Sequence, residues 1–181
     1  MEKTAQDAMS KYAFKPYSPL FPSLVVKEKA RIAPHFLFPA SIEHVGSTAV
    51  TGLGGKGIID IAIAVNKECM EEAKNKLQEL GYEFRPSFST PDRFYFIIYL
   101  PDPEEESRRY HVHLTYPENI EWKELIGFRD YLRTHPEAME EYADVNKQAA
   151  KMANQNGDQY RKMKEPILQK INTFIRGSHV K

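Results

Sequence analysis

A glycine-serine turn followed by an acidic strand is the part of this sequence whose residue types and spacing best suit chemistry. Gly46, Ser47 and Thr48 can direct backbone N–H groups and hydroxyls at a phosphate. Asp60 follows after four more glycines and can hold the Mg²⁺ that such phosphates carry. Lys56, which lies between them, can add positive charge, although a solvated loop lysine is the plainer interpretation. The order of these parts predicts nucleotide chemistry without identifying a substrate.

Asp60 lies near the start of the apolar run 58–65, which reads as a strand. A carboxylate inside such a run costs desolvation energy unless it is paired, hydrogen-bonded or bound to metal. Side chains alternate along a strand, so Asp60 shares its face with Ala62 and Ala64, whose small side chains leave room for a ligand. A turn or cap residue is the alternative interpretation, but we expect a catalytic or metal-binding role.

Two histidines on a later strand are the next candidates. His111 and His113 are two residues apart, so both rings project from one face of a strand over 109–115. They can share a metal, or one can bind metal while the other transfers protons. The alternative is a hydrogen-bonded pair that lines a polar cleft. Glu43 and His44 point to opposite faces of their strand, so only one can enter the same site; Glu43 is the candidate metal ligand and His44 is structural.

Three basic residues in the C-terminal part are candidates for phosphate binding. Arg129 and Arg133 are four apart and share a helix face, so they can present two guanidinium groups to phosphates. Pairing with acidic neighbours on the same helix is the alternative. Lys164 falls on or beside an apolar helix stripe, so it either extends its charge to the surface or reaches into a cleft.

The elements that must position these residues follow from hydrophobic periodicity. Strands come first along the chain and helices last, which predicts an α+β domain with a helical C-terminal section packed on a sheet. We expect a single domain over 1–181, divided into an N-terminal arm (1–20), a sheet core (20–118) and C-terminal helices (119–176). The expected strands are 42–45, 58–65, a short one at 82–85, 94–100 and 109–115; the expected helices are a short one ended by Pro34, then 68–80, 119–134, 136–155 and 158–176.

Some details of these elements are open to a direct check. The run 94–100 is apolar on both faces and so predicts a buried central strand. The segment 101–108, with three consecutive glutamates, predicts a solvated loop. Asp158 is a candidate cap for the last helix, and Pro166 is expected to kink or restart that helix.

Composition limits the class of protein. Twenty-five basic residues balance twenty-five acidic ones, which argues against a nucleic-acid or membrane-surface binder with a large basic excess. The single cysteine, Cys69, cannot form an internal disulfide, and no apolar leader begins the sequence, so we expect a cytoplasmic protein. The apolar runs are far shorter than the roughly 20 residues needed to cross a bilayer.

These motifs closely resemble the signature of the GrpB (UPF0157) family. The resemblance covers residues 15–175 in order, and Tyr160 and Lys164 fit the Tyr-x-x-x-Lys pattern at its end. The segments that carry it are Ile42–Ile61, Tyr110–Leu114 and Phe128–Pro136. The resemblance implies a nucleotidyltransferase-like mixed β-sheet with flanking helices, similar to the polymerase-β superfamily, whose C-terminal helices close over one side of a cleft.

The implied reaction is transfer of a nucleoside monophosphate from a nucleoside triphosphate to a hydroxyl or phosphate acceptor, with Mg²⁺ on the phosphates. In that superfamily a Gly-Ser turn holds the triphosphate, which corresponds to Gly46 and Ser47. Paired carboxylates hold two metals; the first corresponds to Asp60, but the second falls on Ala62, which cannot bind metal. The third strand offers His111 or His113 in place of a carboxylate.

Three hypotheses follow. The first is a nucleotidyltransferase in which Asp60 and His113 are catalytic and Glu43 or His113 completes an unusual site for Mg²⁺, with Mn²⁺ or Zn²⁺ as alternatives. The second, favoured by Ala62, is a non-catalytic nucleotide-binding module. The third is a metal-dependent phosphoesterase built from Asp60, His111 and His113. We favour the first because the Gly-Ser turn suits phosphates better than a simple zinc site requires. The expected ligand is a nucleoside triphosphate or another phosphorylated small molecule.

Overall fold

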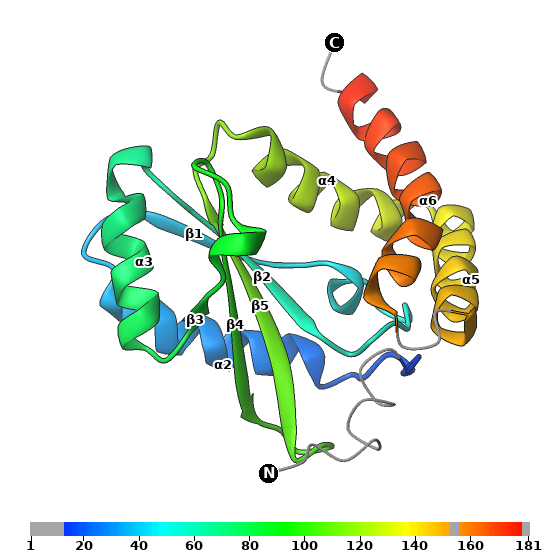
Figure 1. Cartoon of the computed structure of the whole chain (residues 1–181), viewed down its shortest axis with the longest axis horizontal. Helices are drawn as coiled ribbons and strands as arrows, with labels where there is room; N and C mark the ends of the chain where they lie inside the picture. Colours follow the sequence, from blue (N-terminus) through cyan, green and yellow to red (C-terminus); the bar gives the residue numbers. More distant parts are fainter. Residues whose placement is uncertain (1–12, 153–155, 179–181) are drawn as a thin grey trace.

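A five-stranded sheet organises the computed structural model, which describes residues 13–152 and 156–178 (Figure 1). The strand order is β1-β2-β5-β4-β3. Strands β2 and β5 run parallel, and the other neighbouring pairs run antiparallel. This mixed sheet with flanking helices confirms the predicted α+β class. The strands are β1 (Ala40–Val45), β2 (Ile59–Val65), β3 (Glu83–Phe84), β4 (Phe94–Pro101) and β5 (Ser107–Thr115).

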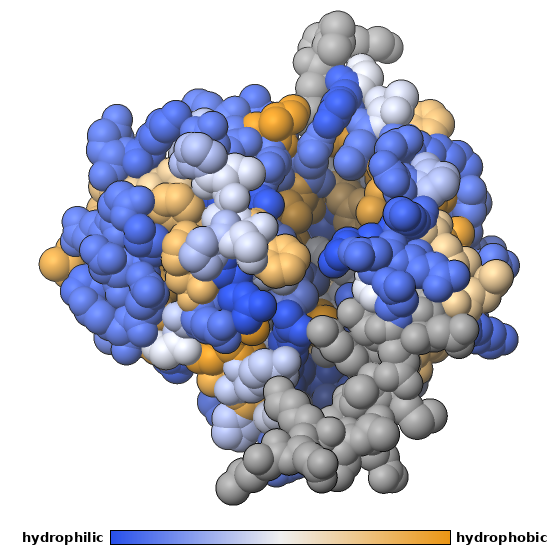
Figure 2. All heavy atoms as spheres, in the orientation of Figure 1, coloured by the Kyte–Doolittle hydropathy of each residue, from blue (hydrophilic) through white to orange (hydrophobic). Residues whose placement is uncertain are grey.

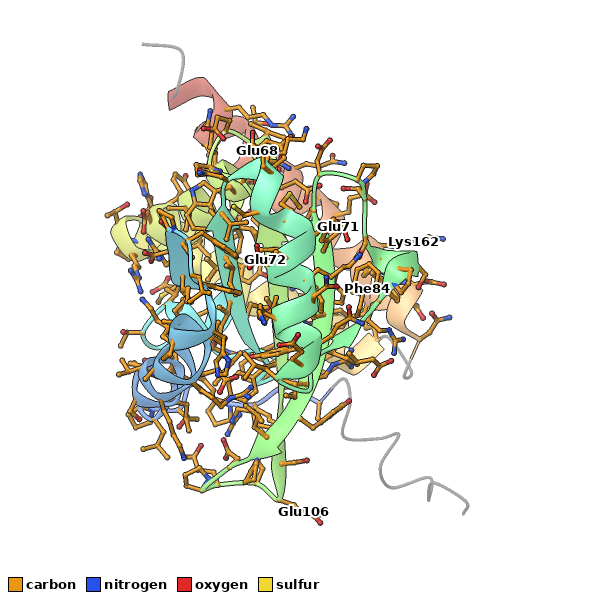
Figure 3. All side chains as sticks on the ribbon, turned by 90° about the vertical axis from the view of Figure 1, so that its left-hand side faces the viewer. Glu68, Glu71, Glu72, Phe84, Glu106 and Lys162 are labelled. Atoms are coloured by element: carbon orange, nitrogen blue, oxygen red, sulfur yellow. The ribbon has the colours of Figure 1, made fainter. Side chains whose placement is uncertain are left out.

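Helices cover both faces of the sheet (Figure 1). Helices α2 (Phe21–Ile32) and α3 (Met70–Glu79) pack on one face, which Figure 3 views from the α3 side with Glu71 and Glu72 labelled on that helix. Helices α4, α5 and α6 gather at the other face, where Asp60 and the two histidines lie. Their bounds are α4 (Ile120–Thr134), α5 (Pro136–Met152) and α6 (Gly157–Ser178), and the one-turn 3₁₀ helices are η1 (Ala33–His35), η2 (Ser47–Ala49), η3 (Lys67–Cys69) and η4 (Pro86–Phe88).

The alternation along β2 and β5 explains how the sheet has one apolar and one polar face. Ile61 and Val112 are register partners, fully buried against α2 and α3. A second apolar core joins α4, α5 and α6 to Val50 and Leu53, which follow η2. The loop after β1 is therefore fastened to the C-terminal helices, and it brings its polar residues to the polar face of the sheet.

The structure corrects the prediction for β4. The central strand is β5, because it lies between β2 and β4, whereas β4 is next to the edge strand β3. Phe96 and Ile97 are buried, but Tyr99 is 58% exposed. The two-residue strand β3 pairs only with Phe96 and Ile97, and the Arg85 N–H donates to the Tyr95 carbonyl. Within the described residues, no strand pairs with 98–101 on that side. The apolar residues on both faces of β4 therefore predicted burial correctly for only part of this strand.

The segment 101–108 is only in part the solvated loop that its glutamates suggest. Strands β4 and β5 continue pairing to Pro101 and Ser107, so the loop is confined to residues 102–106 of a hairpin. Asp102 and Arg108 form an ion pair whose side chains are 0% and 2% exposed. The glutamates that lie between these two residues in the sequence dominate the composition of the segment. A sequence-based prediction therefore misses the buried ion pair.

The cap predicted for α6 is wrong, and one of the two effects expected of Pro166 is absent. Helix α6 continues through Pro166 without ending, so the proline does not restart it, and a kink stays a prediction. Its cap is Asn156, whose Oδ1 accepts hydrogen bonds from the backbone N–H groups of Asp158 and Gln159 at 2.9 and 3.3 Å. Residues 153–155, where the preceding helix was expected to end, lie outside the described residues. No helix in the described part of the chain is long and apolar enough to cross a membrane.

Candidate functional site

A cleft separates the polar face of the sheet from α5 and α6, and Figure 2 shows this face of the molecule hollowed between the two sides. A central cavity of about 210 Å³ adjoins two larger hollows of about 460 and 610 Å³. Gly46 and Asp60 line both the central cavity and the 460 Å³ hollow. Lys56, Tyr160 and Lys164 line both the central cavity and the 610 Å³ hollow. The three spaces therefore form one continuous cleft.

Asp60 and the two histidines converge on the polar face of the sheet. Residues 60 and 111 are register partners on the parallel strands β2 and β5. The Nδ1 of His111 lies 3.1 Å from Asp60 Oδ1, and the Nε2 of His113 lies 3.5 Å from the same oxygen. The Tyr95 ring packs beside both imidazoles, with centroids 5.2 Å apart. One carboxylate oxygen is thus oriented by two imidazoles.

The charge of this group is set by burial and by these hydrogen bonds. Burial opposes ionisation of Asp60, but the hydrogen bonds from His111 and His113 hold the pKa of its carboxyl well below the usual range. Burial lowers the pKa of His111, which Asp60 only partly opposes. An ionised Asp60 beside a neutral His111 places negative charge at the centre of the cleft, and this charge attracts cations.

The turn after β1 lies directly against Asp60. Gly46 has a φ of +74°, and a Cβ at this position would lie 2.7 Å from Asp60 Oδ2. A Cβ at Gly55 would likewise lie 2.9 Å from the hydroxyl oxygen of Ser47. Two bare backbones therefore keep the central cavity open. Thr48 differs from the prediction in position: it is buried, and its hydroxyl lies 2.9 Å from His44 Nε2 outside the residues that line the cleft.

Arg129 and Arg133 contact the protein itself. Arg129 Nη1 donates to Glu43 Oε2 at 2.8 Å and to the His44 carbonyl at 3.1 Å. Arg133 donates from Nε and Nη2 to the Ala49 carbonyl at 3.0 and 2.8 Å. Neither arginine lines the three hollows. Both fasten α4 to the end of β1 and to η2, and the Glu43 carboxylate is engaged by Arg129 instead of joining Asp60.

Two lysines supply positive charge to the cleft. The Lys164 ammonium lies 4.9 Å from the Tyr142 ring centroid and 5.2 Å from that of Tyr160, while the Lys56 ammonium lies 4.8 Å from the Tyr160 ring centroid. Burial works against the charged form of Lys164, but the two tyrosines and Asp60 outweigh it and raise its pKa. Lys164 therefore reaches into the cleft as a cation, which is the functional alternative foreseen for it.

Sequence reasoning missed several residues of the candidate site. Tyr142 and Asn146, which line the cleft, come from α5. Tyr95, which packs beside the two histidines, comes from β4. Asn146 is 1% exposed; its Nδ2 donates to the Gly54 carbonyl at 3.4 Å, and its Oδ1 has no partner in the described residues. A signal was available: Tyr142, Asn146 and Ala149 recur at helical spacing on the buried stripe of α5, so an amide interrupts an otherwise apolar face.

The donor set decides which metal arrangement fits. Within residues 13–152 and 156–178, no group of three or more His, Cys, Asp or Glu side chains could hold a metal ion. Ala62, the second position on β2, contributes no ligand. Mg²⁺ in nucleotide sites is usually held by one or two carboxylates together with substrate phosphates. Asp60 alone therefore fits one Mg²⁺ carried by a triphosphate, and the residues present do not fit a pair of ions.

The burial of His44 predicts that the free energy of unfolding depends on pH. Burial lowers its pKa from 6.5 to about 4, with Asp60 opposing only in part. Between these values the unfolded chain binds a proton that the folded chain does not, so the free energy of unfolding falls as pH decreases through this window, by about 2–3 kcal/mol at most. We expect His44→Gln to remove this pH-dependent part of the free energy of unfolding. Urea unfolding of wild type and variant at pH 7 and pH 4.5 measures it, and equal losses in both proteins would contradict the assignment.

Comparison with solved structures defines the class of fold. A crystal structure of the Cid1 poly(U) polymerase superposes with a TM-score of 0.51 over 81% of this chain and 46% of that chain, at 10% sequence identity. At this identity the likeness concerns the fold alone, which is nucleotidyltransferase-like. A crystal structure of the conserved protein GrpB from Enterococcus faecalis superposes with a TM-score of 0.78, at 26% identity, over 93% of this chain and all of that chain.

Sequence comparison gives the family. The model of the GrpB protein family matches residues 11–173, so the chain belongs to the GrpB family. A UPF0157 protein of Pseudomonas aeruginosa is 30% identical over 158 residues, which are 86% of this chain and 64% of that protein. The glutamate-rich protein GrpB of Alkalihalophilus pseudofirmus is 28% identical over 72% of this chain and 75% of its own length. The chain thus spans slightly less than two thirds of the Pseudomonas relative.

Proposed function

We propose that this protein binds a nucleoside triphosphate with Mg²⁺ in the cleft and transfers its nucleoside monophosphate to an acceptor hydroxyl. The observation that carries this proposal is the convergence of the Gly46–Ser47 turn, Asp60, Lys56 and Lys164 on one central cavity. Bare backbone and hydroxyl donors, two ammonium groups and one carboxylate are the groups that a metal-bound polyphosphate requires.

The two sides of the central cavity have complementary roles. Ser47 and the backbone at Gly46 approach the phosphates from the sheet side, while Lys56 and Lys164 approach from the side of α6. Asp60, through the Oδ2 that faces Gly46, would hold the Mg²⁺. When bound, that ion neutralises phosphate charge and aligns the groups for in-line displacement.

His113 is the group we assign to proton transfer. It lines the 460 Å³ hollow next to Asp60, where an acceptor would lie beside the phosphates. The acceptor oxygen attacks the α-phosphorus, the bond from that phosphorus to the bridging oxygen breaks, and pyrophosphate leaves with the bonding electrons. His113 takes the hydroxyl proton, and Asp60 Oδ1, 3.5 Å from its Nε2, stabilises the resulting imidazolium.

A second candidate is a nucleotide-binding module without turnover. Ala62 favours it, because the second carboxylate of a two-ion site is missing from β2. The phosphoesterase hypothesis has less support, since it requires a protein-held ion and the described residues contain no group of three ligands for one.

The test is calorimetric titration of Mg²⁺ complexes of ATP, GTP, CTP and UTP into wild type and Asp60→Asn, repeated with EDTA. We expect micromolar binding that weakens at least tenfold, about 1.4 kcal/mol, in the variant and in EDTA. Asp144→Asn, an exposed site on α5 with the same change of charge, is the matched control and should bind as wild type does.

The outcomes separate the candidates. Metal-dependent binding with pyrophosphate release in the presence of hydroxyl acceptors supports the transferase. Binding that is indifferent to EDTA and to Asp60→Asn, with no pyrophosphate released, supports the module. Absence of binding by all four nucleotides would overturn both.

A further inference from the structure

A short segment near the start of the described chain pairs with the glycine-rich loop that precedes β2. The Lys15 N–H donates to the Gly55 carbonyl at 2.6 Å, and the Gly55 N–H donates to the Lys15 carbonyl at 3.0 Å. These two bonds form an isolated antiparallel bridge. In Figure 1 the dark blue start of the described chain lies beside the loop that leads into β2. The segment is therefore attached to the candidate site and is not merely an extended arm.

Phe14 fills a space that only a glycine leaves open. A Cβ at Gly54 would lie 2.2 Å from Phe14 Cζ, a distance that no packed side chain tolerates. On its other side the Phe14 ring has the Lys147 ammonium of α5 at 5.6 Å from its centroid. The ring thus contacts both the glycine-rich loop and α5, which the Asn146 amide also joins directly through the Gly54 carbonyl.

The same loop is held at its far end by the β4–β5 hairpin. Arg108 Nη1 donates to the Gly57 carbonyl at 2.8 Å, and the Lys15 ammonium lies 2.6 Å from Glu105 Oε1. Gly54, Gly55 and Gly57 have little backbone preference of their own, because glycine visits more conformations than any other residue. The shape of the loop is therefore imposed by its contacts.

Lys56 lies between these anchors. Its neighbours Gly55 and Gly57 are fixed by the Lys15 bridge and by Arg108, while its own side chain enters the cleft over the Tyr160 ring. We infer that Phe14 and Lys15 are positioning residues, which set the glycine-rich loop so that Lys56 meets the phosphates of the ligand. The ligand named in this inference rests on the proposed function. The geometry rests on the bridge between Lys15 and Gly55.

A ligand-independent experiment tests the geometry. Amide hydrogen exchange, measured by NMR on the full chain, should show that Phe14→Ala increases the exchange rate of the Gly55 N–H at least tenfold. Phe14→Leu, which keeps an apolar group against Gly54, should restore most of the protection. Amides of β2 and β5 should be unaffected, which excludes general unfolding. Unchanged exchange at Gly55 in Phe14→Ala would overturn the inference.

A double-mutant cycle tests the action through Lys56. We expect Phe14→Ala and Lys56→Ala each to weaken MgATP binding about tenfold, and Phe14→Ala to add little in the Lys56→Ala background. Fully additive effects would overturn the inference, because Phe14 would then act by another route. Failure of wild type to bind any of the four Mg²⁺–nucleotide complexes would overturn the proposed function instead, and the exchange result would then decide whether the segment sets the loop.

Discussion

Gly46→Ala is expected to reduce MgATP affinity at least a hundredfold and to lower the free energy of unfolding by about 1–3 kcal/mol. Two causes act together. The backbone at Gly46, with φ of +74° and ψ of −170°, is in a region that is essentially restricted to glycine. The added Cβ would also lie 2.7 Å from Asp60 Oδ2, so it must displace the carboxylate that we assign to Mg²⁺.

Gly52→Ala is the matched control for this prediction. Gly52 also has a positive φ, +82°, but a Cβ there would meet nothing within 4 Å. The control therefore carries strain from a positive φ without the collision, and it should destabilise the protein while leaving MgATP affinity near wild type. Calorimetric titration and urea unfolding of both variants measure the difference. Equal affinities in the two variants would mean that Gly46 does not act through Asp60.

The polar face of the sheet could be predicted because strand geometry is local. Side chains alternate between the two faces of a strand, so His111 and His113 share one face of β5. By the same alternation, Asp60 shares one face of β2 with its small neighbours. The parallel pairing of β2 with β5 then brings the two faces together. This pairing is a long-range feature, so the convergence followed from the family resemblance and not from periodicity alone.

The partners of the helix residues could not be predicted in the same way. Helical spacing shows that Arg129 and Arg133 share a face, but it does not say what that face meets. In the structure they meet the end of β1 and the Ala49 carbonyl, because α4 packs across that corner of the sheet. Asn146 reaches Gly54 from 92 residues away, so its role depends on tertiary packing that no local pattern encodes.

Arg108→Met is expected to lower the free energy of unfolding by about 3–5 kcal/mol, because it leaves the Asp102 carboxylate buried without its cation. The two side chains are 2% and 0% exposed, and Arg108 Nη2 lies 3.0 Å from Asp102 Oδ1. The substitution also removes the bond from Nη1 to the Gly57 carbonyl. Urea unfolding measures the loss, and MgATP titration below the unfolding transition should show weakened binding through the loosened loop.

Two further variants separate burial from charge. Arg85→Met breaks an exposed pair with Glu83, whose side chains are 37% and 61% exposed, and should cost less than about 1 kcal/mol. Arg108→Met combined with Asp102→Asn should cost less than Arg108→Met alone, because an amide can still accept the Glu104 and Glu105 N–H bonds without a stranded charge. If Arg108→Met is as mild as Arg85→Met, the hairpin does not support Gly57, and the glycine-rich loop must depend on its other anchor, the bridge to Lys15.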